Sequence, residues 1–160
     1  MNKAYLLTGG NMGDPEINLG RAREAIAKEC GHILAASSLY KTAAWGKTDQ
    51  SAFLNQALII ETKHDPRTLL KKLLTIEKKN GRIREEKYGP RTLDIDILLY
   101  ADRIIKEPSL TIPHPELQNR RFALAPLAEI ASSIIHPVFN KTIQQLLEEC
   151  SDTSTVQKIL

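Results

Sequence analysis

The 160-residue sequence predicts one α+β domain, and three observations lead to this expectation. Short apolar stretches and two amphipathic stretches follow one another in the order strand, helix, strand, strand, helix, strand. Both amphipathic stretches start at an Asp-Pro pair, which is typical of an N-cap residue followed by a first-turn proline. The polar segment 41–52 is too short for the crossover helix of a parallel sheet, so we expect an antiparallel sheet.

Each element has a local signal in the sequence. The first apolar run ends at Gly9-Gly10, and the two helices begin at Asp14-Pro15 and Asp65-Pro66. Gly81 suits the residue that follows the end of the second helix. In chain order, we expect a strand at 3–8, a helix at 15–29, strands at 33–40 and 53–62, a helix from 66 to the stop at 81, and a strand at 93–100.

This order is that of a ferredoxin-like βαββαβ sandwich, in which an antiparallel sheet carries helices on one face. Prolines divide the last third of the chain into a loop-rich C-terminal extension, with helices near 122–130 and 143–150. Because neither a repeat nor a linker interrupts the chain, we expect a single domain over residues 1–160.

The composition excludes several classes of protein. Hydrophobic residues make up 42% and charged residues 26%, which is ordinary for a globular protein and argues against disorder. The apolar runs are far shorter than the ~18 residues of a membrane span, and no signal peptide is recognisable. Two lone cysteines, Cys30 and Cys150, favour a reducing compartment, so we expect a cytoplasmic protein.

The net charge of +3 is unevenly distributed along the chain. Residues 78–91 contain six basic and two acidic side chains, a net charge of +4, so the remaining residues are close to neutral. A short basic segment of this kind could bind a polyanion, although charged runs are most often solvated loops.

Asp94 and Asp96 form the first candidate site. Side chains two apart on a strand share one face, while Leu93, Ile95 and Ile97 occupy the other. Two neighbouring carboxylates repel each other, and a magnesium ion held by both together with substrate phosphates would relieve that repulsion. The alternative is a pair of salt-bridged or turn-capping carboxylates.

Three arginines lie just before this carboxylate pair. Arg82, Arg84 and Arg91 could bind phosphate oxygens in a bidentate manner, or they could belong to a solvated loop. A metal–polyphosphate ligand would explain the arginines and the aspartates together.

Further candidates depart from ordinary core patterns. Glu77 stands where the helical stripe predicts an apolar residue, so it is either a salt-bridged edge residue or an acceptor for a ligand amino group. Phe53, Asn55 and Phe122 could stack on and hydrogen-bond a flat heterocycle, or they could be ordinary core. His114, between two prolines, could meet a phosphate or form a structural turn.

The segment from Gly89 to Asp96, GPRTLDID, resembles the signature of the 6-hydroxymethyl-7,8-dihydropterin pyrophosphokinases of the folate pathway. Essentially the whole chain shares this resemblance. The supporting motifs, in the family's order and spacing, are Gly10-Asn11, Tyr40-Lys41-Thr42, Phe53-Leu54-Asn55, Glu77 with Gly81-Arg82-Ile83-Arg84, and Pro113-His114 with Asn119-Arg120-Arg121-Phe122.

The resemblance implies a reaction in which the diphosphate of ATP passes to the pterin hydroxymethyl group and AMP is released. Asp94 and Asp96 would hold two Mg²⁺ ions, and Arg82 and Arg91 would complete the catalytic set. The implied ATP-binding residues are Glu77, Arg82, Arg84, Arg91, Ile97, Thr111, His114 and Arg120. The implied pterin-binding residues are Thr42, Ala43, Trp45, Phe53, Asn55, Asp94 and Phe122.

We therefore expect a monomer that binds ATP and the pterin, without a nucleic-acid or membrane partner. Two alternatives remain open at this point. A ferredoxin-like module could bind RNA, although the strand at 53–60 carries a single aromatic residue. An ATPase or ordinary kinase acting on another small alcohol is also possible, although the sequence contains no GxxxxGK[ST] phosphate loop.

Overall fold

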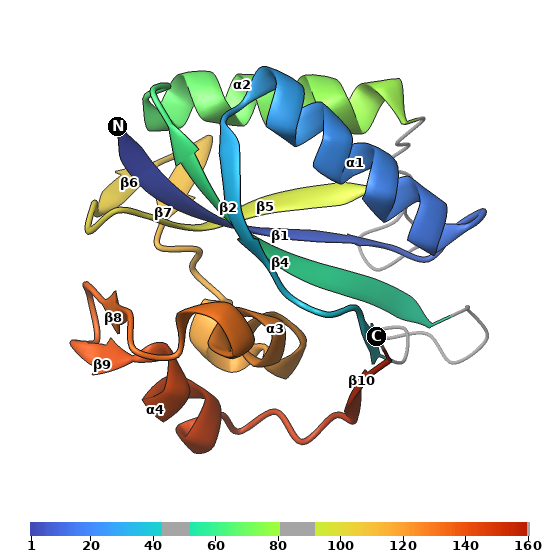
Figure 1. Ribbon diagram of the computed structural model, residues 1–160. Helices are drawn as coiled ribbons and strands as arrows, with labels where there is room; N and C mark the ends of the chain where they lie inside the picture. Colours follow the sequence, from blue (N-terminus) through green and yellow to red (C-terminus); the bar gives the residue numbers. More distant parts are fainter. Residues whose placement is uncertain (43–51, 81–91, 160) are drawn as a thin grey trace.

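A six-stranded antiparallel sheet forms the centre of the computed structural model, which describes residues 1–42, 52–80 and 92–159 (Figure 1). The strand order is β10-β3-β4-β1-β5, and β2 pairs with β4 next to β3. The strands are β1 (Asn2–Gly10), β2 (His32–Ala36), β3 (Tyr40–Thr42), β4 (Phe53–Thr62), β5 (Asp94–Tyr100) and β10 (Val156–Lys158). The α+β class and the antiparallel sheet predicted from the sequence are confirmed.

Two long helices cover one face of the sheet (Figure 1). They are α1 (Pro15–Glu29) and α2 (Pro66–Lys79). Both begin as predicted, because the Asp14 carboxylate accepts a hydrogen bond from the Ile17 N–H at 3.3 Å and the Asp65 carboxylate accepts one from the Thr68 N–H at 2.8 Å. Asn80 is the C-cap of α2, and Gly81, the predicted stop, lies outside the described residues.

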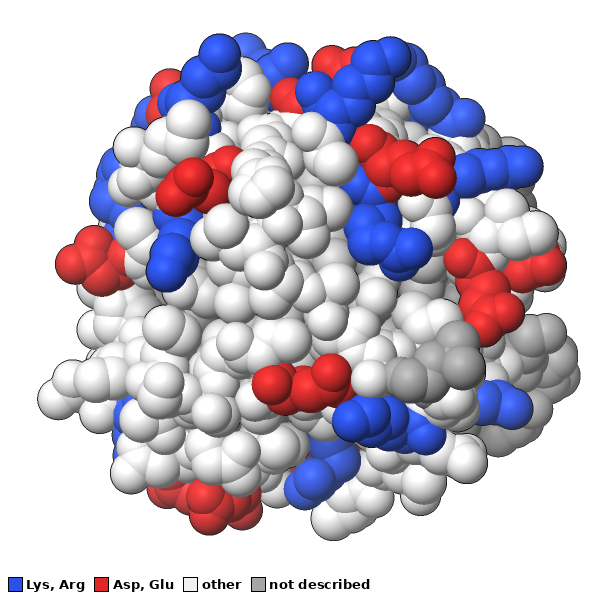
Figure 2. Space-filling model, in the orientation of Figure 1, with Lys and Arg blue, Asp and Glu red and all other residues white. Residues whose placement is uncertain are grey.

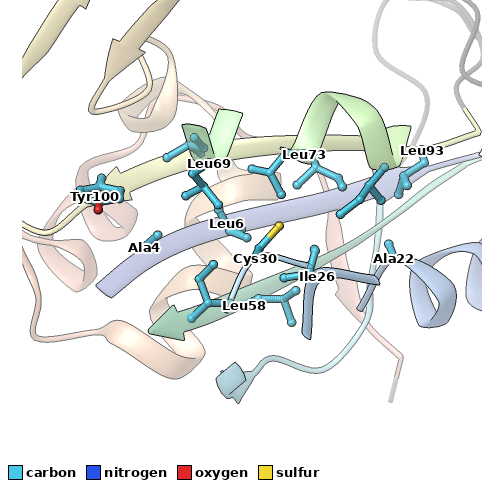
Figure 3. Packing of buried hydrophobic residues seen from close by; sticks show 14 of the residues in the cluster. Ala4, Leu6, Ala22, Ile26, Cys30, Leu58, Leu69, Leu73, Leu93 and Tyr100 are labelled. Atoms are coloured by element: carbon cyan, nitrogen blue, oxygen red, sulfur yellow. The ribbon is translucent and has the colours of Figure 1, made fainter. Parts of the chain in front are cut away.

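The layer between these helices and the sheet is a closed apolar core (Figure 3). Leu6 and Leu58 of the sheet pack in one cluster with Ile26 of α1 and Leu73 of α2, and all four are fully buried. A fully buried leucine contributes about 1.5–3 kcal/mol relative to an exposed one, so this layer supplies much of the stability. Within α2, Leu73 and Ile76 face the core, whereas Leu74 is 38% exposed.

The C-terminal third covers the second face of the sheet (Figure 1). The two helices of the βαββαβ part lie on one face as predicted, whereas the sequence did not predict where the C-terminal extension packs. The strands present apolar side chains on this face as well, including Leu7 and Ala57. Burying them away from water is favourable, and a second layer of helices does so. The covering elements are the 3₁₀ turn η1 (Leu117–Asn119), α3 (Arg121–Ala131) and α4 (Ile143–Glu149), with hairpins β6 (Ile105–Glu107)–β7 (Leu110–Ile112) and β8 (Ile135–His136)–β9 (Lys141–Thr142).

Two predicted strand boundaries are wrong. The strand predicted at 33–40 is two strands, because Ser37 bends the chain between them. Its N–H donates to the Ala57 carbonyl at 2.9 Å, and its hydroxyl accepts from the Ala57 N–H at 2.9 Å. The first strand does not stop at residue 8, since Gly9 and Gly10 both pair with β4 and belong to β1.

Within the described residues, none of the helices has the length and apolar character needed to cross a membrane.

Candidate active site

The sheet register brings the sequence candidates into one row. Tyr40 lies opposite Asn55, Asn55 opposite Gly9, and Gly9 opposite Asp94. Directly opposed residues of antiparallel strands share a face, so this row runs across β3, β4, β1 and β5 on one side of the sheet. Flanking pairs add Thr42 with Phe53 on one side and Leu7 with Asp96 on the other. This is the side that α3 covers.

Asn55 lies across the backbone of β1. It is 7% exposed, and its Nδ2 donates to the Thr8 carbonyl at 3.3 Å. A Cβ placed on Gly9 would overlap this amide nitrogen, so only glycine leaves room for Asn55 in this position. Sequence reasoning treated Gly9 as the end of a strand and missed this role. The available signal was a glycine beside an apolar strand, which often marks a close approach of another group.

Thr42 holds an unsatisfied polar atom in this row. It is buried, and its hydroxyl has no hydrogen-bond partner within the described parts of the chain. A buried hydroxyl without a partner costs about 1–3 kcal/mol, and a polar ligand placed over Phe53 and Asn55 could satisfy it. The row therefore has polar groups suited to the hydrogen-bonding edge of a flat heterocycle.

The carboxylate pair lies at the β5 end of this row, and its strand is hydrogen-bonded to α2. Asp94 and Asp96 are half-buried on one face of β5, while Ile95 and Ile97 point into the core, as predicted. Glu77 of α2 is 2% exposed, and its Oε2 accepts a hydrogen bond from the Ile95 N–H at 2.6 Å. At least one Glu77 oxygen therefore binds the backbone of the strand between the two aspartates, a contact that neither alternative drawn from the sequence included.

His114 lies within electrostatic reach of both Asp96 and Arg120. Its ring Nδ1 accepts from the Glu116 N–H at 3.1 Å, and its backbone N–H donates to the Leu98 carbonyl at 3.0 Å. Burial lowers the pKa of His114, although the Asp96 carboxylate opposes this effect. The neutral ring therefore carries its proton on Nε2, where it can donate to a phosphate oxygen.

The first turn of α3 carries the second aromatic candidate. Phe122 is half-buried against the second core, and the Arg120 guanidinium carbon lies 5.6 Å from the centre of its ring. This distance allows a cation–π contact. Arg120 thus sits between the phosphate candidate His114 and the aromatic candidate Phe122.

The remaining predicted residues divide into two groups. Thr111 is half-buried on β7, and Ile97 packs in the α1–α2 core, so position 97 could contact a nucleotide only through its backbone. The predicted residues that lie outside the described part of the chain are Arg82, Arg84, Arg91, Ala43 and Trp45.

The donor set fits magnesium better than a transition metal. Among the described residues, no group of three or more His, Cys, Asp and Glu side chains could hold a metal ion. Magnesium is usually held by one or two carboxylates together with waters and substrate phosphates, and Asp94 with Asp96 meets that requirement.

A separate hollow of about 490 Å³ lies between α1 and the bend after β2, on the opposite face of the sheet. Its polar groups already bind one another: Arg23 Nη1 donates to Gln56 Oε1 at 2.9 Å, and Gln56 Nε2 donates to the Ser37 backbone carbonyl at 2.7 Å. The hollow is lined by none of the predicted site residues, so the row that contains Asn55 and Asp94 remains the candidate active site.

The ferredoxin-like sheet, with a carboxylate pair and an amide on one face, fits an α+β enzyme. The profile described as 7,8-dihydro-6-hydroxymethylpterin-pyrophosphokinase (HPPK) matches residues 5–132, and the chain belongs to this family. The resemblance noted in the sequence is thereby confirmed, and the activity is a pyrophosphokinase activity of folate biosynthesis.

Two similar proteins bear the name 2-amino-4-hydroxy-6-hydroxymethyldihydropteridine pyrophosphokinase. The protein of Methylorubrum extorquens is 39% identical over 160 residues, covering 99% of each chain. The protein of Haemophilus influenzae is 39% identical over 158 residues, covering 98% of each chain. Among solved structures, wild-type Plasmodium falciparum HPPK-DHPS has a TM-score of 0.73 at 19% identity, covering 93% of this chain and 43% of that chain. This last match supports the fold.

Proposed function

We propose that this chain transfers the diphosphate of ATP to the hydroxymethyl oxygen of 6-hydroxymethyl-7,8-dihydropterin and releases AMP. The hydroxymethyl oxygen forms a bond to the β-phosphorus while the bond between that phosphorus and the AMP oxygen breaks. The observation that carries the proposal is the row on one face of the sheet, in which Asn55, Gly9 and Asp94 lie opposite one another.

The pterin would lie over β3 and β4. Asn55 and the unsatisfied Thr42 hydroxyl supply hydrogen-bonding groups, and the rings of Phe53 and Phe122 supply stacking surfaces. Ala43 and Trp45 remain pterin-binding predictions from the resemblance. This arrangement holds the hydroxymethyl group toward β5, because the row continues from Asn55 to Asp94.

Asp94 and Asp96 are the residues that would hold Mg²⁺. Bound Mg²⁺ neutralises phosphate charge and lowers the pKa of a coordinated hydroxyl. Two ions are proposed, since the resemblance implies two. Their further ligands would be phosphate oxygens and water, because magnesium rarely uses protein ligands alone.

The triphosphate would lie between β5 and the segment before α3. His114 can donate its Nε2 proton to a phosphate oxygen, and Arg120 adds a fixed positive charge nearby. Thr111, Glu77 and the backbone of Ile97 are proposed to contact the adenosine. Arg82, Arg84 and Arg91 are proposed phosphate ligands, with Arg82 and Arg91 in the catalytic set.

We further propose a monomeric, single-domain cytoplasmic enzyme. Both cysteines are free, and Cys30 is buried, which suits a reducing compartment. Size-exclusion chromatography with light scattering would show one species of about 17.9 kDa.

The family assignment favours this enzyme over an RNA-binding module. On the face shown in Figure 2, Lys and Arg side chains gather over the α1–α2 layer, but Asp and Glu side chains lie among them. A phosphate backbone would therefore meet mixed charge on this face.

Product analysis tests the proposal directly. The protein is incubated with ATP, Mg²⁺ and the hydroxymethyl pterin, and the nucleotides and pterins are separated by chromatography. We expect AMP and a diphosphorylated pterin in equal amounts. ADP as the nucleotide product would show a single phosphoryl transfer and would contradict the proposal.

A further inference from the structure

The C-terminal tail, residues 150–159, runs from α4 past α3 to the edge of the sheet (Figure 1). It lies beyond residue 132, where the family match ends. Its strand β10 pairs with β3, and the Ile159 N–H donates to the Leu39 carbonyl at 2.9 Å. The tail therefore joins the same edge of the sheet that carries Tyr40 and Thr42.

On its way, the tail binds the first residue of α3. The Arg121 N–H donates to Asp152 Oδ2 at 3.1 Å, and the Arg121 Nε–H donates to the Asp152 carbonyl at 2.9 Å. The N-cap residue of α3, Arg120, makes no side-chain capping bond. Asp152, 31 positions further along the chain than Arg121, thus caps the N-terminus of α3 with its carboxylate. The residue at the N-cap position does not do so itself.

The Asp152 carboxylate is itself held in place. The Ser154 N–H donates to Oδ1 at 2.9 Å, and the Ser154 hydroxyl donates to the same oxygen. Burial would raise the pKa of Asp152, but these bonds, together with that from Arg121, lower it below its usual value. The cap is therefore charged at neutral pH, which suits the positive end of the helix dipole.

The other end of α3 is tied to the sheet by Glu129. Its Oε1 accepts from the Tyr40 hydroxyl at 2.6 Å, and its Oε2 accepts from the Ser38 N–H at 3.0 Å. Lys158 of the tail lies 3.7 Å from Oε1. Because Tyr40 lies opposite Asn55, the far end of α3 is fixed relative to the proposed pterin site.

We propose that Asp152 is a positioning residue for pterin binding, acting through Phe122. This inference rests on the proposed function. The two proposed stacking rings stand on different elements, Phe53 on β4 and Phe122 on α3, so the gap between them depends on how α3 is held. Apolar packing under α3 is not directional, whereas hydrogen bonds at its two ends set its position along and across the sheet. Phe122 is the residue next to the capped Arg121.

The test measures pterin affinity by calorimetry, at a temperature well below each variant's unfolding midpoint. Asp152→Ala should weaken pterin binding about fivefold, a coupling of the size found between groups in contact. Asp152→Asn should retain most of the affinity, because its amide oxygen can still accept from the Arg121 N–H. The matched control is Asp102→Ala, which removes an exposed aspartate on a turn and should leave affinity unchanged.

A double-mutant cycle separates positioning from a structural role. If Asp152 acts through Phe122, Asp152→Ala should cause no further loss of pterin affinity in a Phe122→Ala background. Equal losses in both backgrounds would overturn the proposal. So would an Asp152→Ala protein with a lower unfolding temperature but wild-type affinity.

Two further measurements keep the outcomes distinct. If Asp152→Ala prevents folding, Arg121→Lys replaces it as the test. This variant keeps the bond from the backbone N–H of residue 121 to Asp152 and loses the bond from Nε, so it should weaken pterin binding to a smaller degree. Unchanged affinity would overturn the inference. A wild-type protein that neither binds nor converts the pterin would overturn the proposed function itself. Wild-type turnover with an unaffected Asp152→Ala variant would overturn only the inference about the tail.

Discussion

The two faces of the same sheet differ in how completely they are covered. Under α1 and α2, side chains such as Leu6, Leu58 and Leu73 form a closed apolar layer, and we call this the closed face. Under α3, apolar residues such as Leu7 and Ala57 fill only part of the surface, and the polar residues Asn55, Asp94 and Asp96 lie beside them. We call this the open face. Because strand side chains alternate, one face can supply stability while the other carries polar groups at little cost to the core.

The largest effect on activity should come from the open face. Asp96→Ala should lower turnover by roughly a thousandfold or more, because it removes a proposed ligand of the Mg²⁺ that would neutralise the reacting phosphates. The unfolding temperature should stay close to that of the wild type, since Asp96 is half-buried and its neighbours Ile95 and Ile97 remain in the core. Steady-state AMP release and thermal unfolding measure the two quantities. Wild-type turnover in this variant would contradict the metal assignment.

The closed face should show the opposite pattern. Leu73→Ala leaves a cavity in the α1–α2 core and should lower the free energy of unfolding by about 2–5 kcal/mol. Turnover measured well below the unfolding transition should change little. Urea titration gives the stability. A loss of turnover as large as that of Asp96→Ala, in a protein shown to be folded, would mean that the two faces are not independent.

Gly9 of β1 lies on the open face between Asn55 and Asp94, and its substitution should have a smaller effect. Gly9→Ala should weaken pterin binding about tenfold, because the new methyl group displaces the buried Asn55 amide from its hydrogen bond to Thr8. Calorimetry with the pterin measures the effect. Gly20→Ala is the matched control, since a Cβ there would lie 4.0 Å from an Arg23 side-chain nitrogen, which is ordinary van der Waals contact. Equal pterin affinities in both variants would show that the position of the Asn55 amide does not contribute to pterin binding.

The smallest effect should come from His136, on the hairpin at the edge of the α3 layer. Burial lowers the pKa of His136 below that of an exposed histidine. Below the unfolded-state pKa of about 6.5, the unfolded chain therefore binds more protons than the folded chain, and stability falls as the pH falls toward the folded-state pKa.

This pH dependence can be isolated by substitution. His136→Gln should lose less stability than the wild type between pH 7.5 and 5.5, by an amount well below the Leu73→Ala effect. Urea titrations of both proteins at both pH values provide the comparison, and an identical pH dependence in the two proteins would contradict the role of His136.

Local signals in the sequence identified much of the site. The shared face of Asp94 and Asp96 follows from strand alternation, and the same rule placed Phe53 and Asn55 together. The two Asp-Pro pairs located both long helices, because capping depends on neighbouring residues. These features need only a few consecutive residues to form.

The features that the sequence did not reveal depend on contacts between distant segments. Ser37 bends its strand through two bonds to Ala57, and Gly9 is needed because Asn55 crosses it. The cover on the second face of the sheet was missed because the composition of 121–149 indicates helices but not which face they bury.

By itself, the sequence determined the order of the elements, the starts of the helices and the candidate residues for the chemistry, since each depends on local spacing and residue type. Only the tertiary structure decided that Asp94, Gly9, Asn55 and Tyr40 form one row, because strand register depends on pairing across the sheet. The same is true of the cap that Asp152 places on α3, since the chain must fold before these residues meet.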